Sequence, residues 1–163
     1  MSLLLVPSLT VYAATPTFSP PMGSIDAIYA LLERVMPGSS AHFELSLGLP
    51  HASDGSGGQD TPAFFALTDS SAGKVAIAAS GASELASGIG YYWREYCNVT
   101  VGWPRGGGSR GVDKLPPSWP AVGTPLLKRR AVPISHIMNV CTHSYSLVWY
   151  SWAEWEAFLD WWL

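Results

Sequence analysis

Three carboxylates near the end of the chain are the first residues whose type and spacing suggest chemistry: Glu154, Glu156 and Asp160. Glycoside hydrolysis uses two carboxyl groups about 5 to 10 Å apart that flank a sugar and differ in environment. Glu156 and Asp160 would share one face of a helix, whereas Ser151 and Glu154 form the Ser-x-x-Glu pattern of a capping box. A helix cap and a solvated helix face explain all three carboxylates. The sequence therefore favours no catalytic residue among them.

A glycine-rich run matches two ligand-binding patterns at once. Gly106 to Gly111 (GGGSRG) fits both the dinucleotide fingerprint G-x-G-x-x-G and the nucleophile elbow G-x-S-x-G. Each of these motifs requires a strand before it and a helix after it. Because Pro116 and Pro117 follow instead, we interpret the run as part of a loop.

The histidines and cysteines lack the spacing of a metal site. They are His42, His51, His136, His143, Cys97 and Cys141. The two cysteines lie too far apart for a zinc signature, and no histidine pairs with a cysteine or a carboxylate at ligand spacing. We therefore expect no metal, no cofactor and two free, partly buried thiols.

Asn98-Val99-Thr100 forms an N-glycosylation sequon, which is used only if the chain enters the secretory pathway. The start of the chain has a short apolar stretch that ends in small residues, with Val11 and Ala13 placed before a cleavage point, but it has no basic segment. We interpret residues 1–22 as a leader or possible signal segment and Asn98 as a glycosylation candidate. The expected location is then secreted or lysosomal/vacuolar.

The amino-acid composition of the chain argues for some classes of binding partner and against others. Charged residues make up 13% of the chain and the net charge is -3, so no strong field favours nucleic acid. No apolar run approaches the roughly 20 residues of a membrane span. All tryptophans except Trp93 and Trp103 lie at or after Trp119. Such a concentration of aromatic residues suits contact with carbohydrate or a protein partner, although core packing is the commoner reason for a tryptophan.

Residues 23–103 show the pattern of a small α/β domain. Apolar spacing predicts a helix from Ile25 to Val35 or Met36 and a second helix from Ala82 to Tyr96. Strands are predicted over 42–49, 63–68, 74–79 and 98–103, the middle two joined as a hairpin. The order indicates an α+β fold in which both helices cover one face of a small sheet. Gly88 and Gly90 weaken the second helix, and we expect them to allow close contact with the sheet.

The rest of the chain divides into a Pro/Gly-rich linker at 104–133 and a strand-helix unit at 134–163. In the helix that begins at Ser151, one apolar stripe runs along the side. Its members are Trp152, Trp155, Leu159 and Trp162. No glycine or proline follows to end the helix, and an isolated domain would avoid such an exposed stripe. The pattern predicts a chain cut within a larger domain.

Residues 139–161 (NVCTHSYSLVWYSWAEWEAFLDW) closely resemble the segment of lysosomal-type α-N-acetylglucosaminidases, glycoside hydrolase family 89, that joins the first strand of the catalytic barrel to its first helix. The helix ending in Val35-Met36-Pro37-Gly38, His42-Phe43-Glu44 and the stretch 82–103 resemble the N-terminal domain of the same family. The resemblance covers about residues 24–163. It implies that an incomplete (β/α) barrel follows the α/β domain.

The resemblance also implies a function. Family members are retaining exo-glycosidases that remove terminal α-linked N-acetylglucosamine, and their two catalytic glutamates lie beyond the residues present here. By this resemblance Asn139, Cys141 and Tyr145 would line the sugar pocket at the end of the first barrel strand. The expected partners are a glycan with terminal N-acetylglucosamine and the remainder of the barrel, and this chain alone would be inactive. The alternative is a non-catalytic carbohydrate- or protein-binding module with a Trp-rich docking helix.

Overall fold

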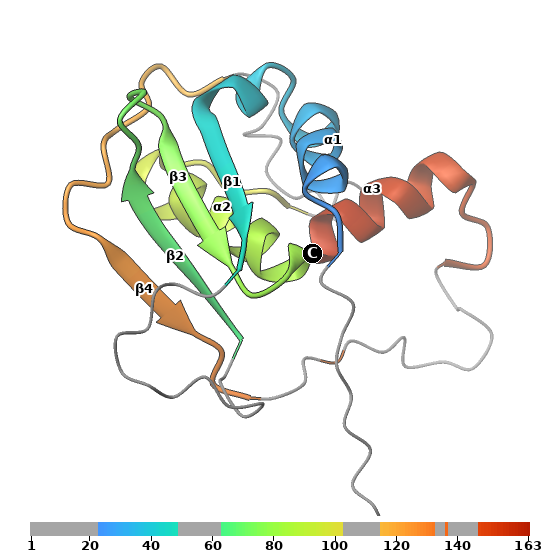
Figure 1. Ribbon diagram of the computed structural model, residues 1–163. Coiled ribbons are helices and arrows are strands. Elements are labelled where there is room, and N and C mark those ends of the chain that lie inside the picture. The colour runs from blue at the N-terminus through green and yellow to red at the C-terminus, as the bar shows by residue number, and fades with distance from the viewer. Residues whose placement is uncertain (1–22, 49–62, 103–114, 133–135, 137–146) are drawn as a thin grey trace, which may run out of the picture.

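A computed structural model describes residues 23–48, 63–102, 115–132, 136 and 147–163. It contains one mixed sheet of four strands in the order β1-β3-β2-β4, together with α-helices and one short 3-10 helix (Figure 1). The strands are β1 (Phe43–Leu47), β2 (Phe64–Asp69), β3 (Val75–Ala79) and β4 (Leu126–Arg129). The helices are α1 (Ile25–Val35), η1 (Ser39–His42), α2 (Ala82–Tyr96) and α3 (Trp152–Trp162). The expected α+β class is confirmed.

The centre of the sheet is the predicted hairpin. Strands β2 and β3 pair antiparallel, with Leu67 opposite Ile77, and a turn at 70–74 joins them. Strand β1 pairs parallel with β3 on the other side, with Leu45 also opposite Ile77. Leu67 and Ile77 are fully buried. Buried residues alternate with exposed residues along β1 and with partly exposed residues along β3, which is the period of two that a sheet with one covered face requires.

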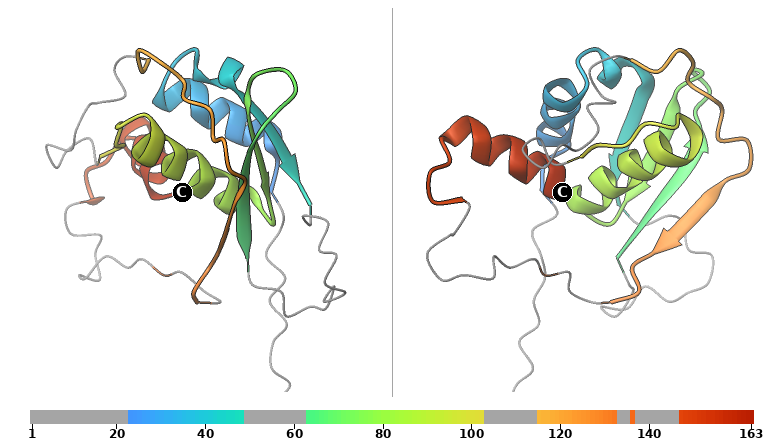
Figure 2. Two further views of the ribbon diagram at one scale, coloured as in Figure 1. Left: turned by 90° about the vertical axis from the view of Figure 1, so that its left-hand side faces the viewer. Right: turned by 180° about the vertical axis from the view of Figure 1, so that it is seen from behind.

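Helices α1 and α2 lie together on one face of the sheet (Figure 2). Helix α1 buries Ile28, Leu31 and Leu32, and α2 buries a longer stripe that includes Leu85 and Ile89. Ser24 caps α1 by accepting a hydrogen bond from the backbone N–H of Asp26. Both helices and their positions on one face agree with the sequence pattern.

The predicted strand over 98–103 is wrong, and the predicted linker contains a strand. Past α2, Val101 makes only an isolated bridge, because the chain turns through a left-handed residue at Asn98 just before it. The fourth strand is instead β4, from within 104–133, which pairs antiparallel with the open edge of β2. Its proline- and glycine-rich surroundings hide this strand from pattern analysis.

Asp69, the last residue of β2, binds the backbone of the segment that leads into β4. Its two carboxylate oxygens accept hydrogen bonds from the backbone N–H groups of Val122 and Gly123 at 2.7 and 2.8 Å. Tyr92 of α2 donates to the carbonyl of Pro120 at 2.7 Å. These contacts hold 120–123 against the sheet and the helix, and β4 then begins at Leu126.

At Gly88, α2 lies in close contact with the sheet. A Cβ atom at this position would lie 2.9 Å from Cγ2 of Ile77 and 3.3 Å from the ring of Phe65. The expected role of Gly88 is therefore confirmed. Gly90 differs, since a Cβ atom there would meet no atom within 4 Å. The expectation that Gly90 also allows close contact with the sheet is wrong, because its side of the helix faces open space.

Helix α3 packs beside α1 through an ion pair between residues far apart in the sequence (Figure 1). The Arg34 guanidinium donates to both carboxylate oxygens of Asp160 at 2.8 and 2.6 Å, and it lies 3.7 Å from Glu156. The Asp160 side chain is only 9% exposed, and the ion pair raises the pKa of Arg34. The expected solvated carboxylate at Asp160 is therefore an interhelical contact.

The capping box of α3 is confirmed. The Ser151 side chain accepts from the backbone N–H of Glu154, while the Glu154 carboxylate accepts from the backbone N–H of Ser151 at 2.8 Å. Two of the backbone groups left without helical partners at this end are thereby satisfied.

We expect opposite effects from the same substitution at Gly88 and Gly90. Gly90→Ala should raise the free energy of unfolding by about 0.5 to 1 kcal/mol, because alanine favours the helix and its methyl group meets open space. Gly88→Ala should lower it by about 1 kcal/mol, because overpacking against Ile77 and Phe65 exceeds that gain. Urea unfolding of both variants measures the difference. Equal stabilisation by the two would contradict the close helix-sheet contact.

Arg34→Ala should loosen α3. Loss of a charged hydrogen-bond partner from a largely buried carboxylate costs about 1.5 to 3 kcal/mol. We expect faster amide hydrogen exchange across Trp152–Trp162 and unchanged exchange in β3. Arg94→Ala is the matched control, because its ion pair with Glu95 is about half exposed on both sides and should contribute little. Equal protection of α3 in both variants would exclude an anchoring role for Arg34.

Candidate functional site

A cavity of about 430 Å³ opens where α1, α2 and the end of α3 meet. Helix α1 contributes Leu31 and Val35, α2 contributes Ala86 and Gly90, and α3 contributes Asp160. The small side chains of Ala86 and Gly90 explain why the groove along α2 stays open. Much of the lining is apolar or aromatic, which suits packing more than charge recognition.

The described lining of this cavity offers few groups that could act as a general acid or base. Asp160 is the only acidic side chain among the described residues that line it, and Arg34 already occupies both its carboxylate oxygens. Glycoside hydrolysis requires two carboxyl groups in different environments. The cavity therefore lacks the pair that such a reaction needs.

Tyr92 in the last turns of α2 and Cys97 directly after the helix are two titratable groups whose pKa values burial raises. Burial, with the nearby Cys97 thiol, raises the pKa of Tyr92 above its usual range. Burial also raises the pKa of Cys97, although a hydrogen bond with Tyr92 lowers it in part. A thiolate is the nucleophilic form of cysteine, so a thiol held protonated is a poor nucleophile. Cys97 is free and partly buried, as expected.

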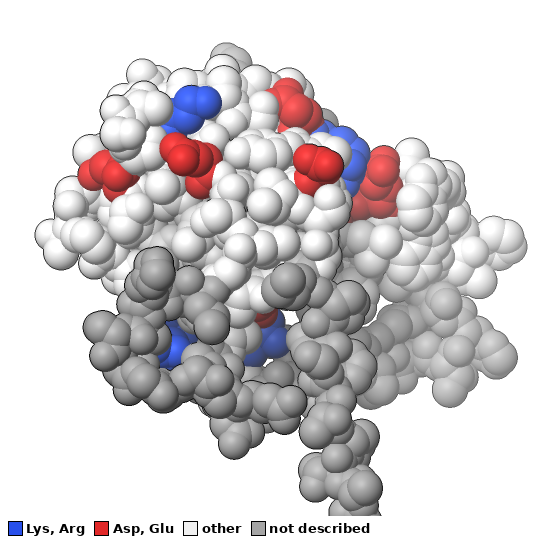
Figure 3. Space-filling view, in the orientation of Figure 1, with Lys and Arg blue, Asp and Glu red and all other residues white. Residues whose placement is uncertain are grey.

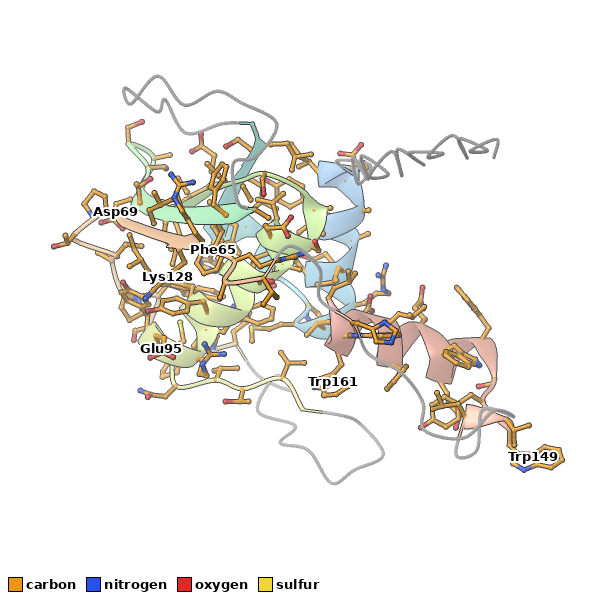
Figure 4. All side chains as sticks on the ribbon, turned by 90° about the horizontal axis from the view of Figure 1, so that it is seen from below. Phe65, Asp69, Glu95, Lys128, Trp149 and Trp161 are labelled. Atoms are coloured by element: carbon orange, nitrogen blue, oxygen red, sulfur yellow. The ribbon has the colours of Figure 1, made fainter. Side chains whose placement is uncertain are left out.

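The start of α3 carries an exposed aromatic surface, which we call the Trp surface and define as Val148, Trp149 and Trp152. Their exposed fractions are 52%, 87% and 71%. In Figure 4 Trp149 stands at the tip of α3 and points away from the sheet. An apolar group this exposed typically marks a surface that another structure covers.

The predicted stripe on α3 is confirmed in part. Trp152, Leu159 and Trp162 are exposed, but Trp155 is half-buried and packs edge-on against Tyr150 and Phe158. Phe158, which the stripe does not include, is the buried residue of the helix at 6% exposure. Four aromatic rings lie within 6.4 Å of it, between centroids.

The surface charges are mixed in sign. On the face that Figure 3 shows, acidic and basic side chains are interspersed, and its described residues form no continuous basic surface of the kind that phosphate recognition requires. Within the described part of the chain, no helix is long and apolar enough to span a membrane. The same residues contain no cluster of three or more His, Cys, Asp or Glu side chains able to hold a metal ion.

The substrate-binding residues expected from the sequence, Asn139, Cys141 and Tyr145, lie outside the described residues. Asn98, the glycosylation candidate, is exposed directly after α2. Sequence analysis missed the contact between Arg34 and Asp160. The only available signal was local, a basic residue in the last turn of α1, and nothing in the sequence linked it to a carboxylate in α3.

Comparison with known proteins gives consistent matches. The family described as Alpha-N-acetylglucosaminidase (NAGLU) N-terminal domain matches residues 26–121. Human alpha-N-acetylglucosaminidase is 35% identical over 136 residues, which cover 83% of this chain and 17% of the human protein. The chain thus spans about one sixth of the length of this relative.

Solved structures of family 89 glycoside hydrolases match this chain as well. A family 89 glycoside hydrolase from Clostridium perfringens in complex with PUGNAc matches with a TM-score of 0.69 and 30% identity, over 83% of this chain and 14% of the bacterial chain. A variant of the Clostridium perfringens enzyme, in complex with its substrate GlcNAc-alpha-1,4-galactose, matches equally well. Since the family match spans more than half of the sequence, this chain belongs to the α-N-acetylglucosaminidase N-terminal domain family and is a member of the family 89 glycoside hydrolases.

Proposed function

We propose that this chain is the N-terminal part of a retaining exo-glycosidase that hydrolyses terminal α-linked N-acetylglucosamine, and that the chain alone does not catalyse the reaction. The observation that carries the proposal is the match over 83% of this chain to an enzyme in complex with GlcNAc-alpha-1,4-galactose. A glycan with terminal N-acetylglucosamine is the proposed substrate. A secreted or lysosomal/vacuolar location goes with this activity.

The proposed role of the α/β layer is to hold the first helix of the catalytic barrel. Helix α3 contacts α1 through Arg34 and Asp160, so the layer determines where this helix lies. The Trp surface faces away from the layer and would pack against the remainder of the barrel. Its desolvation is worth about 25 cal/mol per Å² of apolar area covered.

The proposed domain division is a leader at 1–22, the α/β domain at 23–103, a linker at 104–133 and the first barrel unit at 134–163. Strand β4 lies within this linker and completes the sheet of the α/β domain. Asn139, Cys141 and Tyr145 belong to the barrel unit. We propose that the amide and the phenol bind sugar hydroxyls and that the thiol borders the acetamido methyl group, which suits their donor and acceptor chemistry.

A second candidate function is binding of a carbohydrate or protein without catalysis. The exposure of Trp149 and Trp152 favours this alternative. Aromatic rings with one apolar face exposed are frequent in partner-binding surfaces. The two functions differ in what the chain does alone. A binding module should bind a glycan or protein by itself, whereas an enzyme portion should need its catalytic remainder.

We expect the purified chain to show no hydrolysis of an aryl α-N-acetylglucosaminide and no saturable binding of PUGNAc, because by the family resemblance both catalytic glutamates lie outside these residues. A fusion that places residues 23–163 before the catalytic remainder of the human relative should be soluble and active, whereas that remainder alone should be neither. Rates of aryl glycoside hydrolysis measure this. Hydrolysis or glycan binding that co-purifies with this chain would contradict the proposal. Glycan binding without hydrolysis would support the binding module instead.

The Trp surface should make the isolated chain associate with itself. Replacement of both tryptophans (Trp149→Gln with Trp152→Gln) should lower dye binding and light scattering with little loss of stability, because both side chains are mostly exposed. Phe158→Gln is the contrasting control, since truncating a buried aromatic side chain costs about 3 to 5 kcal/mol and should release α3. Unchanged light scattering in the double variant would contradict this prediction, because it would mean that the two tryptophans do not drive self-association.

A further inference from the structure

The turn that ends α2 carries the sequon in an unusual backbone conformation. Asn98 has a φ of 54°, and it is the only non-glycine residue with positive φ among the residues the structure describes. Asparagine is one of the few residues that adopt this left-handed conformation at low cost. Helices commonly end with such a residue, so the conformation gives Asn98 a structural reason to be asparagine.

Backbone hydrogen bonds fix this turn. The N–H groups of Cys97 and Val99 both donate to the carbonyl of Trp93, at 3.1 and 2.9 Å. The Val99 side chain is buried in the core at 9% exposure. Asn98 and Thr100, on either side of Val99, are both exposed. The two residues that define the sequon therefore lie at the surface, and the middle residue anchors the turn.

We propose that Asn98 carries an N-linked glycan. The amide nitrogen of Asn98 attacks the anomeric carbon of an oligosaccharide held on a lipid diphosphate, which the secretory pathway supplies. The new N–C bond forms, the C–O bond to the diphosphate breaks with its electron pair, and the amide proton passes to a base of the transferase. Only entry into the secretory pathway is required, so the modification does not depend on the proposed hydrolase activity.

The position of the glycan has a consequence for the whole protein. Thr100 and Val101 line the cavity between the helices, so a sugar chain at Asn98 would stand close to the mouth of that cavity. A glycan is large and hydrated, and no protein surface can pack over the residue that bears it. The end of α2 therefore faces solvent in the glycosylated protein.

The test uses the full chain preceded by a host signal peptide, translated in a cell-free system with microsomal membranes. The sequence contains no other Asn-x-Ser/Thr triplet, and Asn139→Gln in every version of the chain removes the rare Asn-x-Cys acceptor at 139–141, so any N-glycan then reports on Asn98. We expect a protease-protected band of reduced mobility that an endoglycosidase returns to the unmodified position. Mass spectrometry after amidase treatment should find aspartate at position 98.

Matched variants separate glycosylation from folding. Thr100→Ser keeps the sequon and should keep the band, whereas Thr100→Ala should lose it. Asn98→Gly should also lose the band while preserving the fold, because glycine adopts positive φ without strain. A translocated, protease-protected chain that remains unmodified would overturn the proposal, as would a band that persists in Thr100→Ala.

Discussion

The close contact of α2 with the sheet at Gly88 is the constraint on which the rest of the structure depends. With no side chain at this position, the helix lies near enough for Ile77 and Phe65 to pack against its backbone. Leu85, Ile89 and Tyr92 of α2 can then reach the interior on either side of that contact. Because α1 packs against α2 as well as β1, the depth of α2 also sets where α1 lies, and through Arg34 it sets where α3 lies.

This chain of contacts joins regions that the sequence separates widely. Arg34 and Asp160 are 126 positions apart, and loss of Arg34 would leave a largely buried carboxylate without its counter-charge. A guanidinium with two parallel hydrogen bonds also fixes orientation, not only distance. The α/β layer therefore determines the angle at which α3 lies against α1.

The elements that could be predicted from the sequence are those whose signals are local. The sequence predicts α1, α2, the β2-β3 hairpin and the Ser151–Glu154 capping box correctly. The signal for each of them comes from residues that are close in the sequence. Strand β4 was missed because its position depends on Asp69, which binds the backbone of Val122 and Gly123 from across the sheet. Phe158 was missed for a related reason. The tryptophans around it dominate the pattern of α3, and only packing shows which aromatic side chain is enclosed. The candidate substrate residues came from resemblance alone, since isolated Asn, Cys and Tyr residues have no pattern of their own.

Several polar groups of the described residues are held by other parts of the protein and are not free to react. Catalysis requires groups whose pKa values are shifted toward the working pH and whose reactive atoms stay accessible. Burial instead raises the pKa values of Tyr92 and Cys97, which keeps both groups protonated. Arg34 occupies both carboxylate oxygens of Asp160, so these oxygens are not accessible to a ligand. Asp69 likewise binds backbone N–H groups with both of its oxygens. The side chains of Tyr92, Arg34, Asp160 and Asp69 thus hold backbone groups or helices in position. Among the described residues, the most exposed large apolar side chains are those of Trp149 and Trp152, and an aromatic surface of this kind suits packing and not acid-base chemistry.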